Sequence, residues 1–307
     1  MQYIRLGNSG LKVSKLCLGT MNMGTPDWKP WIFDEQRSEP IVKHALDAGV
    51  NFIDLADFYS AGVGEEVLGR ILNRLVRRED IVVTTKVGYG TRPGINASGH
   101  SRKHIMDSID ASLTRLGMDY VDLYMLHFYD LNSPVEEVMA TLNDIVKAGK
   151  ARYIGVSTML TGQLAKILMA CERNGWVKPI NMQLQLNCAY REEEREMIPF
   201  CRDQGLGVSV SAGPRSADRR RAVHTQPDRF LHPADVRRRS FLGDRPFGAA
   251  SGPASWRIQC ADSPGLGAEP PRRGLHAGRR RQQRAVRQRP GRAGDASGRG
   301  GVVRAGA

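Results

Sequence analysis

The chain has 307 residues, of which 41% are hydrophobic and 25% charged, so it is long enough for one large domain or two ordinary ones. The first residues do not show the basic segment followed by an apolar one that is typical of an export signal. No stretch approaches the ~18 apolar residues of a membrane span. We therefore expect a cytoplasmic protein outside the membrane. The five cysteines are odd in number and form no CxxC pair, which indicates neither a disulfide framework nor a metal site.

The net charge of +13 would fit a nucleic-acid-binding protein, but its location argues against this for most of the chain. The segment after Ser211 holds 21 of the 45 basic residues, all arginine, and 7 of the 32 acidic residues. That segment therefore carries +14 and the preceding residues −1. The basic character belongs to the C-terminal segment alone.

Short apolar runs alternate with helical patterns from the first residue to about Ser211. The runs YIRL and LKVS, separated by the turn residues Gly-Asn-Ser-Gly, predict an opening hairpin. Seven further strands are predicted, at residues 16–19, 51–55, 81–86, 121–127, 153–157, 180–184 and 207–211.

The helical patterns between these strands carry recognisable start signals. Ser133 and Glu136 form a predicted capping box, with Pro134 at the first helical position. Similar patterns precede Gly117 and follow the acidic pair at 65–66. Strands that alternate with helices indicate parallel strands joined by helical crossovers.

Two architectures satisfy this alternation, a doubly wound open sheet and a (β/α)8 TIM barrel. The only candidate dinucleotide fingerprint, Gly88-Tyr89-Gly90, has the wrong spacing to Gly94 and leads to Pro93 rather than into a helix. The sequence therefore favours an α/β fold of the barrel type, incomplete with about seven strands. Active sites of such barrels lie at the C-terminal ends of the strands.

Four polar residues fall at these strand ends or just beyond them: Asp54, Tyr59, Lys86 and His127. Reduction of a carbonyl needs a proton donor for an oxygen that becomes strongly basic, and a phenol beside an ammonium group suits this task. We expect Lys86 to lower the pKa of Tyr59, Asp54 to hold Lys86 protonated, and His127 to position the carbonyl.

Each of these four residues also has an ordinary structural interpretation. Asp54 could be a turn residue, Tyr59 a rim aromatic, Lys86 a solvated strand end and His127 a core histidine. The ordered set is more specific than any member alone.

Five segments of the chain resemble the aldo-keto reductases, particularly bacterial members near the potassium-channel beta-subunit type: LKVSKLCLGTMNMG, GVNFIDLADFYSAGVGEEVLGRIL, VVTTKVG, LGMDYVDLYMLH and KAGKARYIGVST. The resemblance covers about residues 1–210. It implies an enzyme that reduces aldehydes or ketones with NADPH, and it matches Asp54, Tyr59, Lys86 and His127 to the family's catalytic tetrad. Tyr59 would be the general acid and base, and the partner a small carbonyl substrate.

The resemblance also implies which residues contact the cofactor: Gly19, Thr20, Met21, Asp54, Ser157, Thr158 and Gln183. Thr158 departs from the asparagine of many members, although a hydroxyl can still donate a hydrogen bond. For Ser157 and Thr158 the alternative interpretation is helix capping. Phe128 and Tyr129 would line the substrate pocket or pack its rim.

The C-terminal segment, residues 212–307, is rich in Arg, Gly, Ala and Pro and continues none of the family's motifs after the domain at 1–211. Neither a WSPLARG-like segment nor a phosphate-binding turn is recognisable. Translation of a GC-rich gene out of frame explains this composition best. The alternative is an inactive, truncated barrel whose disordered, arginine-rich tail binds nucleic acid or an acidic partner. The sequence does not determine the oligomeric state.

Overall fold

The computed structural model describes residues 1–188, 190–211 and 257–261, all within the first of two compact units, Met1–Leu266 and Gly267–Ala307. None of the helices formed by these described residues is long and apolar enough to cross a membrane.

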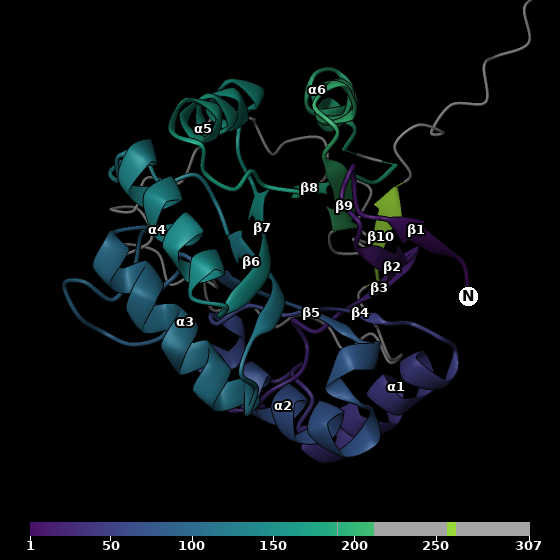
Figure 1. Ribbon diagram of the computed structural model, residues 1–307. Helices are drawn as coiled ribbons and strands as arrows, with labels where there is room; N and C mark the ends of the chain where they lie inside the picture. Colours follow the sequence, from purple (N-terminus) through teal and green to yellow (C-terminus); the bar gives the residue numbers. More distant parts are fainter. Residues whose placement is uncertain (189, 212–256, 262–307) are drawn as a thin grey trace, which may run out of the picture. The chain divides into compact units, whose positions relative to one another are not determined.

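A hairpin and seven parallel strands form the sheet structure, as predicted (Figure 1). The hairpin pairs β1 (Tyr3–Arg5) with β2 (Lys12–Ser14). The parallel strands follow one another around a ring in chain order. They are β3 (Leu16–Gly19), β4 (Phe52–Asp54), β5 (Val82–Val87), β6 (Val121–Leu126), β7 (Ala151–Ser157), β8 (Asn181–Gln185) and β9 (Gly207–Ser211).

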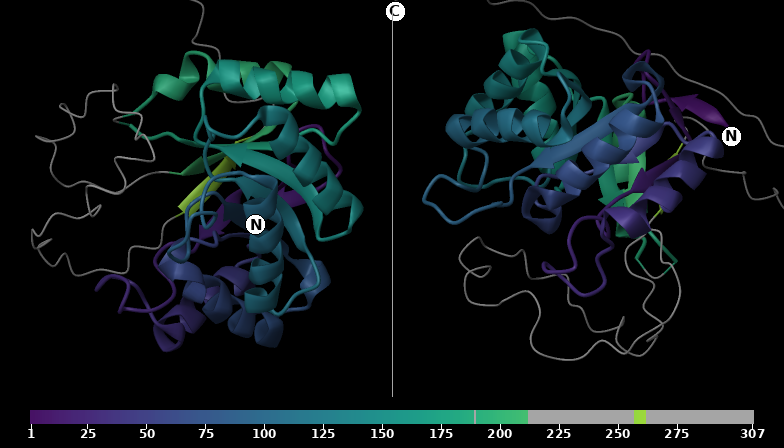
Figure 2. Two further views of the ribbon diagram at one scale, coloured as in Figure 1. Left: turned by 90° about the vertical axis from the view of Figure 1, so that its left-hand side faces the viewer. Right: turned by 90° about the horizontal axis from the view of Figure 1, so that it is seen from below.

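Helices connect the strands and lie on the outer side of the ring (Figures 1 and 2). The predicted helices at 65, 105 and 133 are confirmed to within a few residues. The α-helices are α1 (Glu35–Asp47), α2 (Val63–Leu75), α3 (Arg102–Leu116), α4 (Val135–Lys147), α5 (Thr161–Asn174) and α6 (Met197–Asp203). Three short 3-10 turns are η1 (Tyr59–Gly62), η2 (Arg78–Asp80) and η3 (Glu192–Glu194).

The predicted capping box of α4 is wrong. Pro134, not Ser133, is the N-cap residue, and no side chain caps this helix. The Ser133 hydroxyl instead donates to Oδ2 of Asp130 at 2.7 Å. This charge-assisted bond holds the Ser133 hydroxyl at the carboxylate rather than at the helix terminus.

An eighth strand, β10 (Arg257–Ala261), lies between β3 and β9 and is antiparallel to both. It closes the ring where a (β/α)8 barrel has a parallel strand, so the parallel part of the barrel is incomplete, as expected. The sequence patterns gave no indication of this strand. The other residues of the predicted tail lie outside the described part of the chain, and the frameshift and nucleic-acid interpretations remain predictions.

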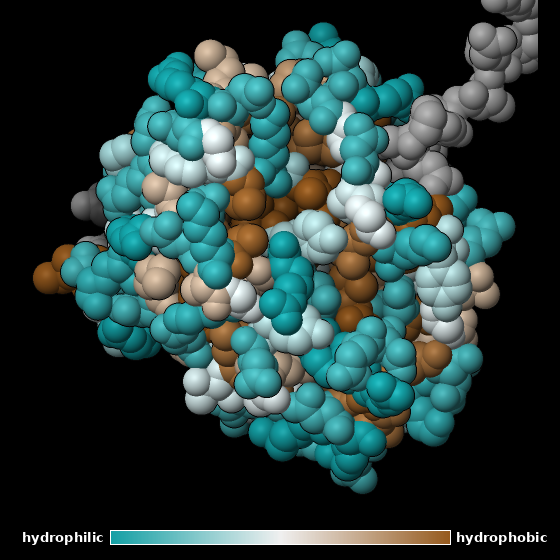
Figure 3. Space-filling model, viewed as in Figure 1, coloured by the Kyte–Doolittle hydropathy of each residue, from teal (hydrophilic) through white to brown (hydrophobic). Residues whose placement is uncertain are grey.

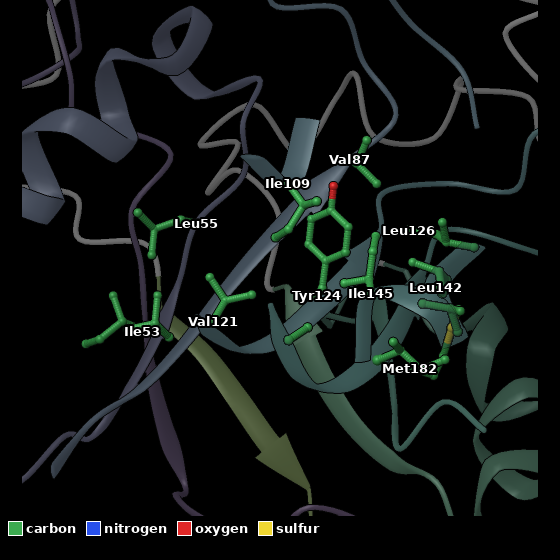
Figure 4. Close-up of a cluster of buried hydrophobic side chains, with 14 of the residues drawn as sticks. Ile53, Leu55, Val87, Ile109, Val121, Tyr124, Leu126, Leu142, Ile145 and Met182 are labelled. Atoms are coloured by element: carbon green, nitrogen blue, oxygen red, sulfur yellow. The ribbon is translucent and has the colours of Figure 1, made fainter. Parts of the chain in front are cut away.

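Two layers of apolar side chains hold the fold together. The larger layer packs the helices onto the outward faces of the strands, with Tyr124 at its centre (Figure 4). Hydrophilic residues cover most of the helix surfaces, and hydrophobic ones show between them (Figure 3). The smaller layer fills the N-terminal end of the ring beneath the hairpin: Leu6, Val13, Cys17, Phe52, Val82, Leu123 and Met125.

Side-chain alternation along the strands places the polar candidates inside the ring. Phe52 and Val82 belong to the inner layer, so Asp54 and Lys86, two and four residues further on, face the same interior. The N-terminal end of the ring is thus apolar and the C-terminal end polar.

Gly69 allows α2 and α3 to pack closely, and its replacement should destabilise the fold. A Cβ at this position would lie 2.4 Å from the Leu116 carbonyl oxygen, which is backbone and cannot turn away. We expect Gly69→Ala to lower the free energy of unfolding by about 1–3 kcal/mol. Gly162→Ala in α5 is the matched control: its Cβ meets nothing within 4 Å, so higher helix propensity should give a small gain. Urea unfolding of both variants measures the difference, and equal effects would contradict the packing argument.

Candidate active site

Four polar residues converge at the C-terminal mouth of the ring. Asp54 ends β4, Lys86 is the penultimate residue of β5, and His127 follows β6 directly. Tyr59 is the first residue of η1, in the loop after β4. The predicted strand ends therefore bring these side chains to one site.

The ammonium group of Lys86 is fully buried, and all three of its protons have acceptors. Nζ donates to Asp54 Oδ2 at 2.7 Å, to the Leu55 carbonyl oxygen at 2.7 Å and to the Tyr59 hydroxyl at 3.4 Å. The other Asp54 oxygen accepts from Nε2 of Gln183 at 3.0 Å. These bonds fix the ammonium group close to the phenol oxygen.

The pKa values of this pair follow from burial and mutual attraction. Burial alone would lower the pKa of Lys86, but Asp54 and Tyr59 together raise it above its usual value, so the lysine is charged. For Tyr59, burial raises the pKa more than the attraction of Lys86 lowers it. Lys86 lowers the pKa of Tyr59, as expected, but the cost of desolvating the phenolate, which the sequence does not reveal, outweighs this effect and the net shift is upward.

His127 stands beside the phenol as a neutral imidazole. Its ring centroid is 6.0 Å from that of Tyr59, in an edge-to-face arrangement. Burial, reinforced by the charge of Lys86, holds the pKa of His127 well below its usual value. Nδ1 is buried and has no hydrogen-bond partner among the described residues. A neutral ring carries one N–H, which can donate to a substrate oxygen.

A strained turn holds Tyr59 in place. Ser60 and Ala61 both have φ of 54°, and Gly62 has φ of 97°, a left-handed conformation that costs non-glycine residues energy. The Ser60 hydroxyl accepts a hydrogen bond from the backbone N–H of Thr25 at 3.0 Å. The loop after β3 thereby fastens the turn that carries the phenol.

The predicted cofactor residues at the end of β3 are tied to Asp54. The backbone N–H of Thr20 donates to the Asp54 carbonyl oxygen at 3.1 Å, and Oγ1 of Thr20 donates to the same oxygen at 2.9 Å. Gly19 is the register partner of Asp54, and Met21 follows as a half-buried residue. The predicted contact segment 19–21 therefore lies at the mouth next to the four polar residues.

The remaining predicted cofactor residues lie on the neighbouring strands. Ser157 ends β7 and is paired in register with Gln183 of β8, and the hydroxyls of Ser157 and Thr158 are 3.1 Å apart. Neither hydroxyl caps α5, whose N-cap residue is Leu160, so the capping interpretation is wrong. Ser157 is buried and Thr158 exposed.

Thr158 has φ of 51°, which is unusual for a β-branched residue and gives a stability prediction. Asparagine tolerates this left-handed conformation far better. We expect Thr158→Asn to raise the free energy of unfolding by about 1 kcal/mol through relief of strain. Thermal or urea unfolding measures it, with Thr161→Asn at the start of α5 as the control. A less stable Thr158→Asn variant would show that the hydroxyl contact with Ser157 outweighs the strain.

Aromatic rings line one side of the mouth, and sequence reasoning found only part of them. Tyr89 is central, with its ring centroid 4.8 Å from those of both His127 and Phe128, and 5.0 Å from that of Phe58. Trp28 adds a further edge-to-face contact with Phe58 at 5.5 Å. We call Trp28, Phe58, Tyr89 and Phe128 the aromatic wall. Phe58 directly precedes Tyr59, a signal that could have been used, whereas Trp28 lies in an unpatterned loop.

The polar groups at this mouth fit the nicotinamide end of a dinucleotide. The hydroxyls of Ser157 and Thr158 can donate or accept, and Gln183 keeps its carbonyl oxygen as an acceptor after bonding to Asp54. A carboxamide needs donors and acceptors of this kind. The segments in which the resemblance would place phosphate contacts fall outside the described residues.

Comparisons with known proteins agree with this geometry. The model of the "Aldo/keto reductase family" matches residues 15–214. The chain is 42% identical over 226 residues to a versiconal hemiacetal acetate reductase of Aspergillus parasiticus, covering 68% of this chain and 66% of that protein. It is also 42% identical over 227 residues to a putative aryl-alcohol dehydrogenase of Schizosaccharomyces pombe, covering 66% and 64%. The chain thus spans slightly less than two thirds of each relative.

A solved structure shares the fold. The crystal structure of a thermostable aldo-keto reductase in complex with the inhibitor epalrestat superposes with a TM-score of 0.59 and 30% sequence identity. The match covers 68% of this chain and 71% of that one.

Proposed function

This chain belongs to the aldo/keto reductase family, whose members are oxidoreductases, and we propose that it reduces aldehydes or ketones to alcohols with NADPH and a proton from Tyr59. One observation carries the proposal: the buried ammonium of Lys86 is paired with Asp54 and lies 3.4 Å from the Tyr59 hydroxyl. This is the arrangement that a phenol needs in order to act as an acid.

The proton would move from Tyr59 to the carbonyl oxygen as that oxygen becomes basic. Burial keeps the phenol protonated beforehand, and Lys86 stabilises the phenolate that forms. Asp54 keeps the lysine charged and in position. His127, as a neutral imidazole, would donate to the carbonyl oxygen and orient it. The cofactor, when bound, supplies the hydride.

Seven residues would hold the nicotinamide end of the cofactor: Gly19, Thr20, Met21, Asp54, Ser157, Thr158 and Gln183. Their placement at one mouth supports this role, because segment 19–21 is bonded to Asp54 and Gln183 joins Asp54 to β8. NADPH rather than NADH is proposed from the family resemblance alone, because the family as a whole uses both nicotinamide cofactors.

Aldehyde-dependent oxidation of NADPH by the purified chain tests the proposal. Benzaldehyde is the probe of choice, because the aromatic wall lies beside Tyr59 and His127, and the two relatives are named for a hemiacetal acetate and for aryl alcohols. We expect one benzyl alcohol for each NADPH consumed. A folded chain that oxidises no NADPH with benzaldehyde or with simple aliphatic aldehydes would contradict it. Salt-dependent retention on a nucleic-acid column would instead favour the alternative, an inactive barrel whose arginine-rich tail binds nucleic acid or an acidic partner.

A further inference from the structure

Asp57 is a buried acidic residue that the proposed reaction leaves unused. It is 1% exposed, and neither carboxyl oxygen accepts a hydrogen bond from a side chain of the described residues. It lies between Asp54 and Tyr59 in the chain, and its backbone N–H donates to the Lys86 carbonyl oxygen at 3.1 Å. A buried acid without a side-chain partner thus lies next to the strand end that carries Lys86.

The charged groups around this carboxyl are already committed to other partners. Glu65, itself fully buried, accepts from Oγ1 of Thr85 at 2.5 Å and from Nε of Arg115 at 2.8 Å. The three protons of Lys86 are taken as described above. Four titratable or charged side chains interact electrostatically with Asp57: Glu65 of α2, Arg115 of α3, Lys86 of β5 and Tyr124 of β6.

An ionised carboxylate in this place would be costly, because no side chain of the described residues donates to it in place of the water it loses. Burial, followed by the negative charge of Glu65, raises the pKa of Asp57 well above its usual value. Arg115, the backbone N–H of Phe58 and Lys86 oppose this shift without reversing it. The neutral acid is the form that fits the surroundings.

We propose that Asp57 is a positioning residue, held by the fold as a neutral carboxylic acid so that the charge of Lys86 acts on Asp54 and Tyr59 alone. When Asp57 ionises in alkaline solution, a second carboxylate near Lys86 disfavours the phenolate of Tyr59 and slows proton transfer. The loss of activity at high pH is then set in part by Asp57. This role rests on the proposed carbonyl reductase function, whereas the protonation of Asp57 does not.

Infrared spectroscopy tests the protonation without any need for turnover. The wild-type chain at neutral pH should show the C=O stretch of a protonated carboxylic acid, and Asp57→Asn should remove it. Asp107→Asn is the matched control, because Asp107 is an exposed partner of Lys103 on α3 and the band should survive its replacement. A wild-type spectrum without the band, or a band that survives in Asp57→Asn, overturns the proposal.

The pH dependence of stability gives a second, independent reading. If native Asp57 keeps its proton where an unfolded aspartate has lost it, folding takes up a proton above pH ~3.9. The free-energy cost of burying Asp57 in its protonated form is then absent at low pH, and it grows as the pH rises toward the pKa of Asp57 in the folded chain. The folding equilibrium of wild type relative to Asp57→Asn should therefore fall by up to about tenfold per pH unit in that window. Urea unfolding at a series of pH values measures this difference. Free energies of unfolding that change with pH in the same way for wild type and Asp57→Asn would contradict the raised pKa.

The pH profile of kcat tests the positioning role itself. Because asparagine is a neutral isostere, Asp57→Asn should retain turnover of benzaldehyde at neutral pH and shift the midpoint of the alkaline decline upward by about one pH unit. Superimposable profiles overturn the positioning role even if the carboxylic acid band is present. A wild-type chain without any turnover refutes the proposed function instead, and the band still decides whether Asp57 is neutral.

Discussion

Tyr59→Phe should lower kcat for carbonyl reduction by about 10²–10⁴-fold, the usual contribution of a positioned general acid. The substitution removes only the hydroxyl that lies 3.4 Å from Nζ of Lys86. The ring and its contact with His127 remain, so the substrate should bind about as well as before. Steady-state rates with NADPH and benzaldehyde, reported as kcat and KM separately, measure the effect.

Tyr89→Phe is the matched control for this experiment. Tyr89 belongs to the aromatic wall and its ring centroid is 4.8 Å from that of His127, but its hydroxyl makes no contact with Lys86 that would activate it. We expect kcat to change little and any effect to fall on KM. Undiminished turnover in Tyr59→Phe, together with a large loss in Tyr89→Phe, would show that Tyr89 and not Tyr59 donates the proton. This result would contradict the proposed mechanism.

Most of the fold could be predicted from the sequence because the spacing of hydrophobic residues indicates, for each helix or strand separately, which face is buried. The strand patterns at 51–55 and 81–86 already fixed which side chains face the interior, and with them the positions of Asp54 and Lys86. The strand at 257–261 could not be found in this way. Five residues of alternation in an arginine-rich segment do not say which edges they pair with, and these edges come from β3 and β9, far away in the chain.

The residues of the site could be predicted from the sequence, but the direction of their pKa shifts could not. Residue types at strand ends identified Tyr59, but the sign of its pKa shift depends on how deeply the fold buries it. The sequence does not single out Asp57 for the same reason. An acidic residue next to a turn is expected to be exposed to solvent, and only the packing of α2 and α3 shows that this one is buried. Burial of a charge is a property of the assembled fold and not of a local pattern.

Lys86→Met should destabilise the chain by about 3–5 kcal/mol, because it leaves the carboxylate of Asp54 buried without its cation. The amide of Gln183 would be its remaining side-chain donor among the described residues. Activity should fall as well, since no charge would stabilise the phenolate of Tyr59. Urea unfolding and the kcat for benzaldehyde give the two readings.

The double variant Lys86→Met/Asp54→Asn separates these two effects. The asparagine oxygen can still accept from Gln183, and no unpaired charge is left in the interior, so most of the lost stability should return. Turnover should not return, because the ammonium group that acts on Tyr59 is still missing. With Asp54→Asn as the second single variant, the coupling between the two substitutions measures the buried ion pair in the folding free energy, while the loss of kcat in Lys86→Met and in the double variant measures the role of Lys86 in catalysis. A single Lys86→Met variant as stable as wild type would show that the buried pair does not form in solution, and a double variant that regains activity would show that proton transfer does not need the lysine.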